Sequence, residues 1–80
     1  MNDQQVKAYV LVVVEIGSDH EVAEKIKQID SEVRVETDLV FGEFDLVAVI
    51  HAPTIKKLDS VITKIRRLPG VIKTVTLVAS

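Results

Sequence analysis

The chain has 80 residues, with ten Lys and Arg against twelve Asp and Glu, and it contains no Cys. This length allows one small domain, and the missing Cys excludes disulfides and thiolate metal sites. A net charge of −2 argues against a dedicated nucleic-acid binder. The apolar run at residues 8–14 is too short to cross a bilayer and lacks the flanks of a signal peptide, so we expect a cytoplasmic protein.

The first half of the chain predicts a strand, a helix and a second strand. Residues 8–16 are apolar and rich in β-branched side chains, which is typical of a strand. The S-x-x-E pattern from Ser18 to Glu21 predicts a capping box, and apolar residues then recur at helical spacing. Residues 33–40 alternate apolar and charged side chains, as a half-exposed strand does.

The second half predicts a strand, a helix and a last strand. Residues 44–51 form an apolar strand that follows a reversal at Gly42, and we expect this turn to depend on Gly42 rather than on Asp45. Apolar residues at spacings of three and four then predict a helix with Thr54 as its N-cap. The Pro-Gly pair at residues 69–70 ends that helix, and the last strand covers residues 71–79.

The predicted order is β-α-β-β-α-β, which indicates a ferredoxin-like α+β fold: a four-stranded antiparallel sheet with two helices on one face. The uncovered face should be polar if it meets water, yet the strands are apolar on both faces. We therefore expect a homodimer packed sheet against sheet, a dimeric α+β barrel. The sequence leaves open which alternate set of side chains faces the helices. The set assigned to the dimer interface is Leu11, Val13, Val47, Val49, Val75 and Leu77.

Motifs for catalysis or metal binding are missing from the sequence. It has no Cys nucleophile, no G-x-S-x-G, no H-E-x-x-H and no Gly-rich phosphate loop. His20 and His51 have no partners at the spacing of a metal site. We expect neither enzymatic activity nor a metal or other cofactor.

Polar side chains gather around the predicted hairpin and on the last strand. Carboxylates and hydroxyls can hold an ammonium group, and backbone N–H groups near Gly42 can hold a carboxylate. An α-amino acid presents both groups. An ordinary structural role explains the same residues, since acidic turns and Thr-rich strands are common. The residues concerned are Thr37, Asp38, Glu43, Asp45, Thr74 and Thr76.

The chain resembles the effector-binding domain, or RAM domain, of the Lrp/AsnC transcriptional regulators. Three motifs carry the resemblance: a G-x-[aromatic]-D turn at residues 42–45, LPGV at residues 68–71, and T-x-T at residues 74–76. It extends from about Val6 to the end of the chain. We therefore assign residues 1–5 to a short N-terminal extension and residues 6–80 to the domain.

The resemblance implies a ferredoxin-like domain that dimerises through its sheets, with dimers assembling further into octamers of four dimers. It implies an amino acid bound at the contacts between dimers, close to the hairpin. Carried over by position, Gly42, Glu43, Phe44 and Asp45 would line this site, with Thr74 and Thr76, and then Thr37 and Asp38, as further contributors.

Full-length members begin with a helix-turn-helix domain of roughly fifty residues, whereas only five residues precede the first strand here. The expectation is a stand-alone amino-acid-sensing domain that modulates full-length Lrp/AsnC regulators without contacting nucleic acid or membrane itself.

Three other interpretations of the sequence stay open. An ACT-like amino-acid-binding domain has the same element order but usually carries a Gly-rich turn after its first strand, where this chain has one Gly. A small dimeric α+β barrel enzyme would need polar residues inside its barrel, and the strands here are aliphatic. An oligomerisation module without a ligand would have almost the same sequence, and only binding data would distinguish it.

Overall fold

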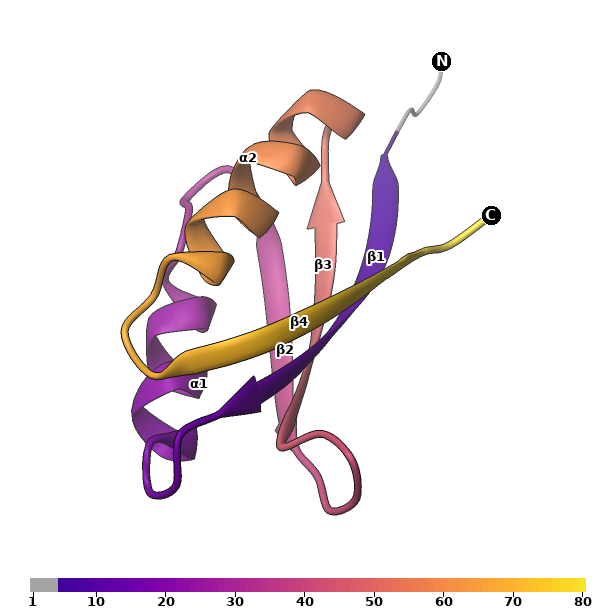
Figure 1. Ribbon diagram of the computed structural model, residues 1–80. Helices are drawn as coiled ribbons and strands as arrows, with labels where there is room; N and C mark the ends of the chain where they lie inside the picture. The colour runs from indigo at the N-terminus through magenta and orange to yellow at the C-terminus, as the bar shows by residue number, and fades with distance from the viewer. Residues whose placement is uncertain (1–4) are drawn as a thin grey trace.

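The computed structural model describes residues 5–80, and its six elements follow the predicted order. The strands form one antiparallel sheet in the order β2-β3-β1-β4, and both helices pack on the same face of it (Figure 1). The predicted ferredoxin-like α+β fold is confirmed. The elements are β1 (Val6–Val14), α1 (Asp19–Lys27), β2 (Arg34–Leu39), β3 (Leu46–Ala52), α2 (Ile55–Arg66) and β4 (Val71–Val78).

The two central strands, β1 and β3, alternate regularly between a buried face and an open one. Their even-numbered side chains face the helices, which resolves the choice that the sequence left open. The apolar stripes of the helices close the core from the other side. The core side chains are Ala8, Val10, Val12 and Val14 of β1, Leu46, Ala48, Ile50 and Ala52 of β3, Val22, Ala23 and Ile26 of α1, and Leu58, Val61 and Ile65 of α2.

The two helices begin in different ways. In α2 the Oγ1 atom of Thr54 accepts a hydrogen bond from the N–H of Lys57 at 3.0 Å, so the predicted N-cap is confirmed. Ser18 occupies the N-cap position of α1, but its side chain makes no capping bond, so the predicted capping box is wrong. The Ser18 side chain packs instead against Gly70, where an added Cβ would lie 3.3 Å from the Ser18 Cβ.

A cluster of charges fastens the loop after α1 to α2. Asp30 Oδ1 accepts from the N–H of Glu32 at 2.8 Å, and Asp30 Oδ2 lies 3.2 Å from Lys57 Nζ and 2.9 Å from Lys64 Nζ. Lys57 also pairs with Glu32 at 2.7 Å. The Glu32 N–H first, and then Lys64 and Lys57, hold the pKa of Asp30 well below its ordinary value of 3.8. Hydrogen bonds to Glu32 and Asp30 raise the pKa of Lys57.

Candidate functional site

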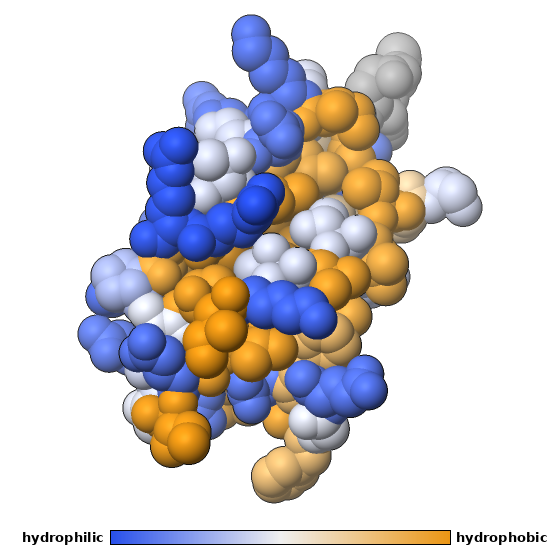
Figure 2. Space-filling model, in the orientation of Figure 1, coloured by the Kyte–Doolittle hydropathy of each residue, from blue (hydrophilic) through white to orange (hydrophobic). Residues whose placement is uncertain are grey.

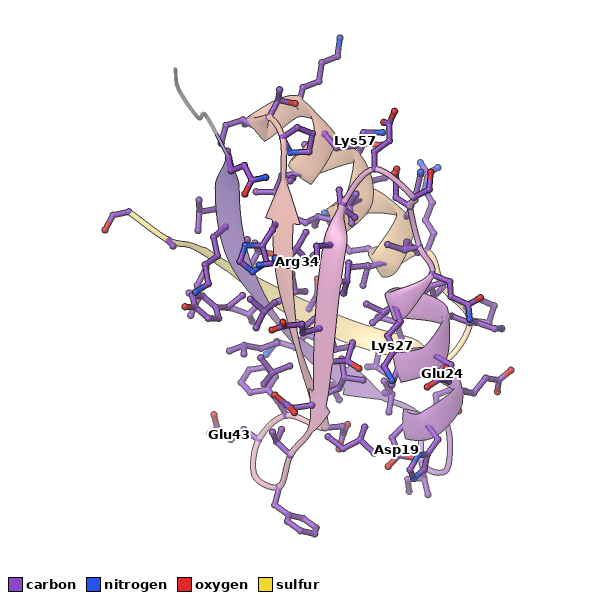
Figure 3. All side chains as sticks on the ribbon, turned by 180° about the vertical axis from the view of Figure 1, so that it is seen from behind. Asp19, Glu24, Lys27, Arg34, Glu43 and Lys57 are labelled. Carbon is purple, nitrogen blue, oxygen red and sulfur yellow. The ribbon has the colours of Figure 1, made fainter. Side chains whose placement is uncertain are left out.

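The turn between β2 and β3 projects from one end of the sheet (Figure 1). Gly42 has a φ of +129°, the positive value predicted for the reversal. The N–H of Val40 donates to the carbonyl of Asp45 at 3.0 Å and closes the loop. Glu43 is exposed and points away from the sheet (Figure 3), whereas Phe44 is half-buried. The hairpin therefore presents an exposed carboxylate on a loop that lies outside the sheet.

The carboxylate of Asp45 has a partner within the chain. Its Oδ2 atom accepts a hydrogen bond from the N–H of Val14 at 2.9 Å, and its own N–H donates to the carbonyl of Val12 at 2.9 Å. These bonds lie where the pairing of β1 with β4 shifts register, between Val13 and Val14. Asp45 therefore ties the start of β3 to the end of β1. The sequence analysis expected this turn to depend on Gly42 rather than on Asp45, whereas the structure gives the Asp45 side chain a hydrogen bond to β1.

The other polar candidates lie on different faces of the sheet. In the strand register Thr37 stands opposite buried Ala48, so its side chain is on the helix side of β2, while its neighbour Asp38 is on the open side. Thr74 and Thr76 stand opposite Val12 and Val10, so they face the helices from β4. Within one chain, β1 separates these two Thr residues from the hairpin.

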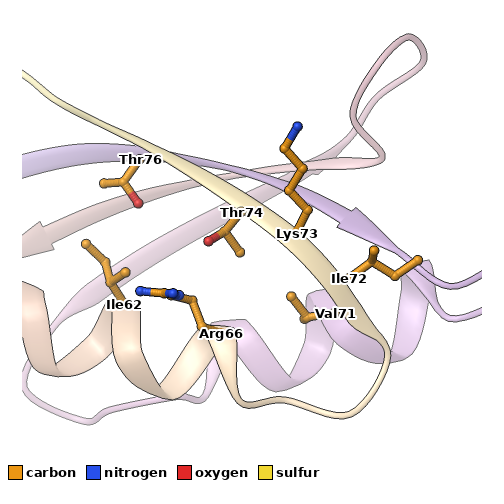
Figure 4. Close-up of a pocket in the computed structure, with 7 residues that line it drawn as sticks. All are labelled: Ile62, Arg66, Val71, Ile72, Lys73, Thr74 and Thr76. Carbon is orange, nitrogen blue, oxygen red and sulfur yellow. The ribbon is translucent and has the colours of Figure 1, made fainter.

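Thr74 and Thr76 line a groove between α2 and the edge strand β4 (Figure 4). The groove has a volume of about 540 Å³. Both Thr side chains point toward α2, and the Arg66 side chain runs along the groove from the last turn of that helix (Figure 4). Lys73 points to the other side of the strand. The remaining lining residues are Ile62, Val71 and Ile72.

The sheet face opposite the helices is open. It is largely apolar over the middle of β4, β1 and β3 and charged along β2, where Glu36 and Asp38 stand opposite Val49 and Val47. Two rows of three side chains cross it, Leu77–Tyr9–Val49 and Val75–Leu11–Val47, each joined by strand pairing. Val13 follows Leu11 on the same face. All six predicted interface residues thus lie here, most half-buried and Leu77 53% exposed. Apolar atoms gather on the side of the molecule away from the helices (Figure 2). An exposed apolar patch of this kind is typical of an interaction surface.

The sequence matches the family model described as the Lrp/AsnC ligand binding domain over residues 7–80. The chain belongs to this family. It is therefore a ligand-binding domain of a regulatory type, as the turn and strand motifs indicated. A search of curated proteins returned no match.

Solved structures share the fold of this chain, and two of them are also similar to it in sequence. The chain is 39% identical to FFRP-DM1, covering 94% of this chain and 99% of that one, with a TM-score of 0.84. It is also 39% identical to the hypothetical protein PHS023 from Pyrococcus horikoshii, covering 94% of this chain and 89% of that one, with a TM-score of 0.83. Escherichia coli AsnC, 20% identical with a TM-score of 0.78, shares the fold over 92% of this chain and 50% of its own.

Two features of this Lrp/AsnC domain escaped the sequence analysis. Tyr9 occupies the centre of an apolar row on the open face. Its spacing of two and four residues from Leu11 and Val13 could have placed it there, because residues two apart on a strand share a face. Arg66 was indistinguishable from the other basic residues of its helix, because only the position of β4 beside α2 places it in a groove.

Within residues 5–80, no three side chains of His, Asp or Glu come together as a metal site would require. None of the helices in this range is both long and apolar enough to cross a membrane.

Proposed function

We propose that this Lrp/AsnC domain senses an amino acid at the β2–β3 hairpin, works as an oligomer, and modulates Lrp/AsnC-type regulators without catalysis or DNA binding of its own. The observation that carries the proposal is the family match over residues 7–80 together with the G-x-[aromatic]-D turn at the hairpin. The exposed carboxylate of Glu43 and the half-buried one of Asp45 supply negative charge for an ammonium group. Backbone N–H groups near Gly42 supply donors for a carboxylate.

The open sheet face supports the oligomeric part of the proposal. A second copy packed against it would remove both apolar rows from water and give an isologous two-fold dimer. Assembly of four dimers into an octamer would then place the hairpin of one dimer near another dimer. In that arrangement Thr74 and Thr76 would reach an effector from a neighbouring chain, and Thr37 and Asp38 would stand at the rim of the site.

The test is light scattering and thermal melting of the purified chain, alone and with each of the twenty amino acids. A mass or melting temperature that responds to a subset of them supports a sensor and names its ligand class. An assembly that is indifferent to all twenty refutes amino-acid sensing, and a chain that stays monomeric at micromolar concentration refutes the sheet-to-sheet dimer.

Asp45→Asn locates the site without removing the structural bond, because the amide oxygen can still accept from the Val14 N–H. Loss of a charge-assisted contact of about 1.5–3 kcal/mol should weaken effector binding by about ten- to a hundredfold. Asp59→Asn, an exposed change on α2, is the matched control and should leave the affinity unchanged. Equal affinities for Asp45→Asn and the unaltered chain would remove Asp45 from the site.

One observation favours a second function, an oligomerisation module without a ligand. The bond from Val14 to Asp45 explains the carboxylate at the mouth of β3 with no ligand at all. This alternative predicts a stable oligomer and no response to any amino acid, so the same screen decides between the two.

A further inference from the structure

Three basic side chains form a row across the open face of the sheet, beside the apolar rows. In the strand register Arg34 of β2 stands opposite His51 of β3, and His51 stands opposite Lys7 of β1 (Figure 3). Side chains directly opposite on one face lie about 5 Å apart at their Cβ atoms, and like charges there repel. Within residues 5–80, none of the three takes part in an ion pair or a side-chain hydrogen bond. The row therefore concentrates positive charge that no ion pair of the described residues neutralises.

A hollow of about 360 Å³ lies beside this row and is lined by Arg34 and by half-buried His51. Its volume is within the range of about 300–1,000 Å³ that is usual for small-molecule sites. Glu32 also lines the hollow, but its carboxylate lies 2.7 Å from Lys57 Nζ, which compensates its charge. The remaining lining residues are Gln5, Ser31, Val33 and Pro53. The hollow thus combines cationic and neutral hydrogen-bond donors, as the binding of an anion requires.

The hollow is remote from the hairpin. The hairpin precedes Leu46, the first residue of β3, whereas His51 is the last but one residue of the same strand. Lys7 leans toward the apolar rows, since its Nζ atom lies 5.2 Å from the centroid of the Tyr9 ring. Lys7 therefore adds positive potential to the site, while Arg34 and His51 supply the side chains that line it.

We propose that Arg34 and His51 bind a small doubly charged oxyanion in this hollow: phosphate, or the phosphate group of a small molecule. The guanidinium of Arg34 donates two parallel hydrogen bonds to two of the anion's oxygens. His51 in its protonated form donates a third, and the bound anion offsets the repulsion within the basic row. The site is formed by one chain and needs no ammonium group on the ligand, so it stands independently of amino-acid sensing at the hairpin.

A simpler explanation is that the row only adds charge to a solvated end of the sheet. Two matched pairs of variants separate this explanation from a binding site. Arg67 is exposed at the end of α2 and does not line the hollow, so Arg67→Gln removes the same charge as Arg34→Gln from another place. His20 is exposed on α1, so His20→Gln is the matched control for His51→Gln.

The experiment is equilibrium dialysis of the purified chain against ³⁵S-labelled sulfate, with sodium chloride holding the ionic strength constant. We expect saturable binding that approaches one sulfate per chain. Arg34→Gln should weaken this binding about tenfold or more, and Arg67→Gln should leave it unchanged. Arg34→Lys should bind less tightly than the unaltered chain, because an ammonium cannot form the two parallel bonds.

The dependence of sulfate binding on pH tests His51. Sulfate stays doubly charged between about pH 5.5 and pH 8, whereas a histidine gains its charge over this range. The charged groups that face His51 are Lys7 from β1, Arg34 from β2 and, diagonally, Glu36 from β2, and both helices pack on the other face. We expect sulfate to bind several-fold more tightly at the lower pH. His51→Gln should abolish this difference, and His20→Gln should preserve it.

Binding that does not saturate, or that weakens equally in Arg34→Gln and Arg67→Gln, would overturn the site, as would a pH dependence that survives His51→Gln. Competition against labelled sulfate distinguishes the two sources of the anion. Displacement by glycerol 3-phosphate at lower concentration than by inorganic phosphate supports a phosphorylated small molecule as the ligand, and the reverse order supports free phosphate. Saturable binding that depends on Arg34 supports the site even if no amino acid changes the mass or melting temperature of the chain.

Discussion

Replacing Asp45 by Ala is expected to destabilise the fold, because the Asp45 carboxylate holds the end of β1. Its Oδ2 atom accepts from the Val14 N–H at 2.9 Å, and Val14 is only 7% exposed. Without this acceptor the Val14 N–H would be left unpaired beside the core. A hydrogen bond to a charged group contributes about 1.5–3 kcal/mol, and an unsatisfied buried donor costs about 1–3 kcal/mol. The free energy of unfolding should therefore fall by about 1.5–3 kcal/mol.

Urea unfolding followed by circular dichroism measures this loss, at one fixed protein concentration because association adds to apparent stability. Asp45→Asn keeps a neutral acceptor and should lose clearly less than Asp45→Ala. Glu43→Ala, an exposed change in the same hairpin, should stay within about 0.5 kcal/mol of the unaltered chain. If Asp45→Ala unfolded at the same urea concentration as the unaltered chain, the carboxylate would not hold β1.

Three further predictions test the open face, the charge cluster and the helix caps. Val49→Asp, at the β3 end of the row Leu77–Tyr9–Val49, should shift the proposed dimer to monomers in sedimentation, since a charge there would be buried unpaired in the interface. Asp30→Asn should make the free energy of unfolding depend less on pH under acid conditions. The lowered pKa of Asp30 stabilises the fold fully above about pH 5 and progressively less as pH falls through the folded-state pKa. Thr54→Ala should cost about 1 kcal/mol in urea unfolding and Ser18→Ala much less, because only Thr54 makes a capping bond.

The sequence predicted the order of elements because the apolar residues repeat with the period of each one. It could not predict which face of the sheet meets the helices, since both alternate sets of β1 and β3 are apolar. In the structure, the side chains on the two faces of the sheet differ in size. The helix side includes Ala8, Ala48 and Ala52, all fully buried, where small side chains let the helices approach the sheet closely. Small residues at every second position of a strand could therefore have identified the side that faces the helices.

Local sequence motifs did not predict side-chain contacts between residues that are distant in sequence. The Ser18–Glu21 pattern matched a capping box, but the Ser18 side chain makes no capping bond and lies beside Gly70, which is distant in sequence. The sequence analysis made no prediction for Asp30. Its partners Lys57 and Lys64 are 27 and 34 residues away, so only the folded chain brings the three charges together.

The structural role of Asp45 and its proposed role in binding are compatible. The bond from Val14 fixes the Asp45 side chain before any ligand arrives, so an effector would not have to order it. Such preorganisation raises affinity by lowering the entropy lost on binding. Asp45→Asn and Asp45→Ala therefore separate the two roles. If the charge serves only the fold, both variants bind an amino acid as the unaltered chain does. If the charge also serves the ligand, Asp45→Asn keeps most of the stability and loses the binding.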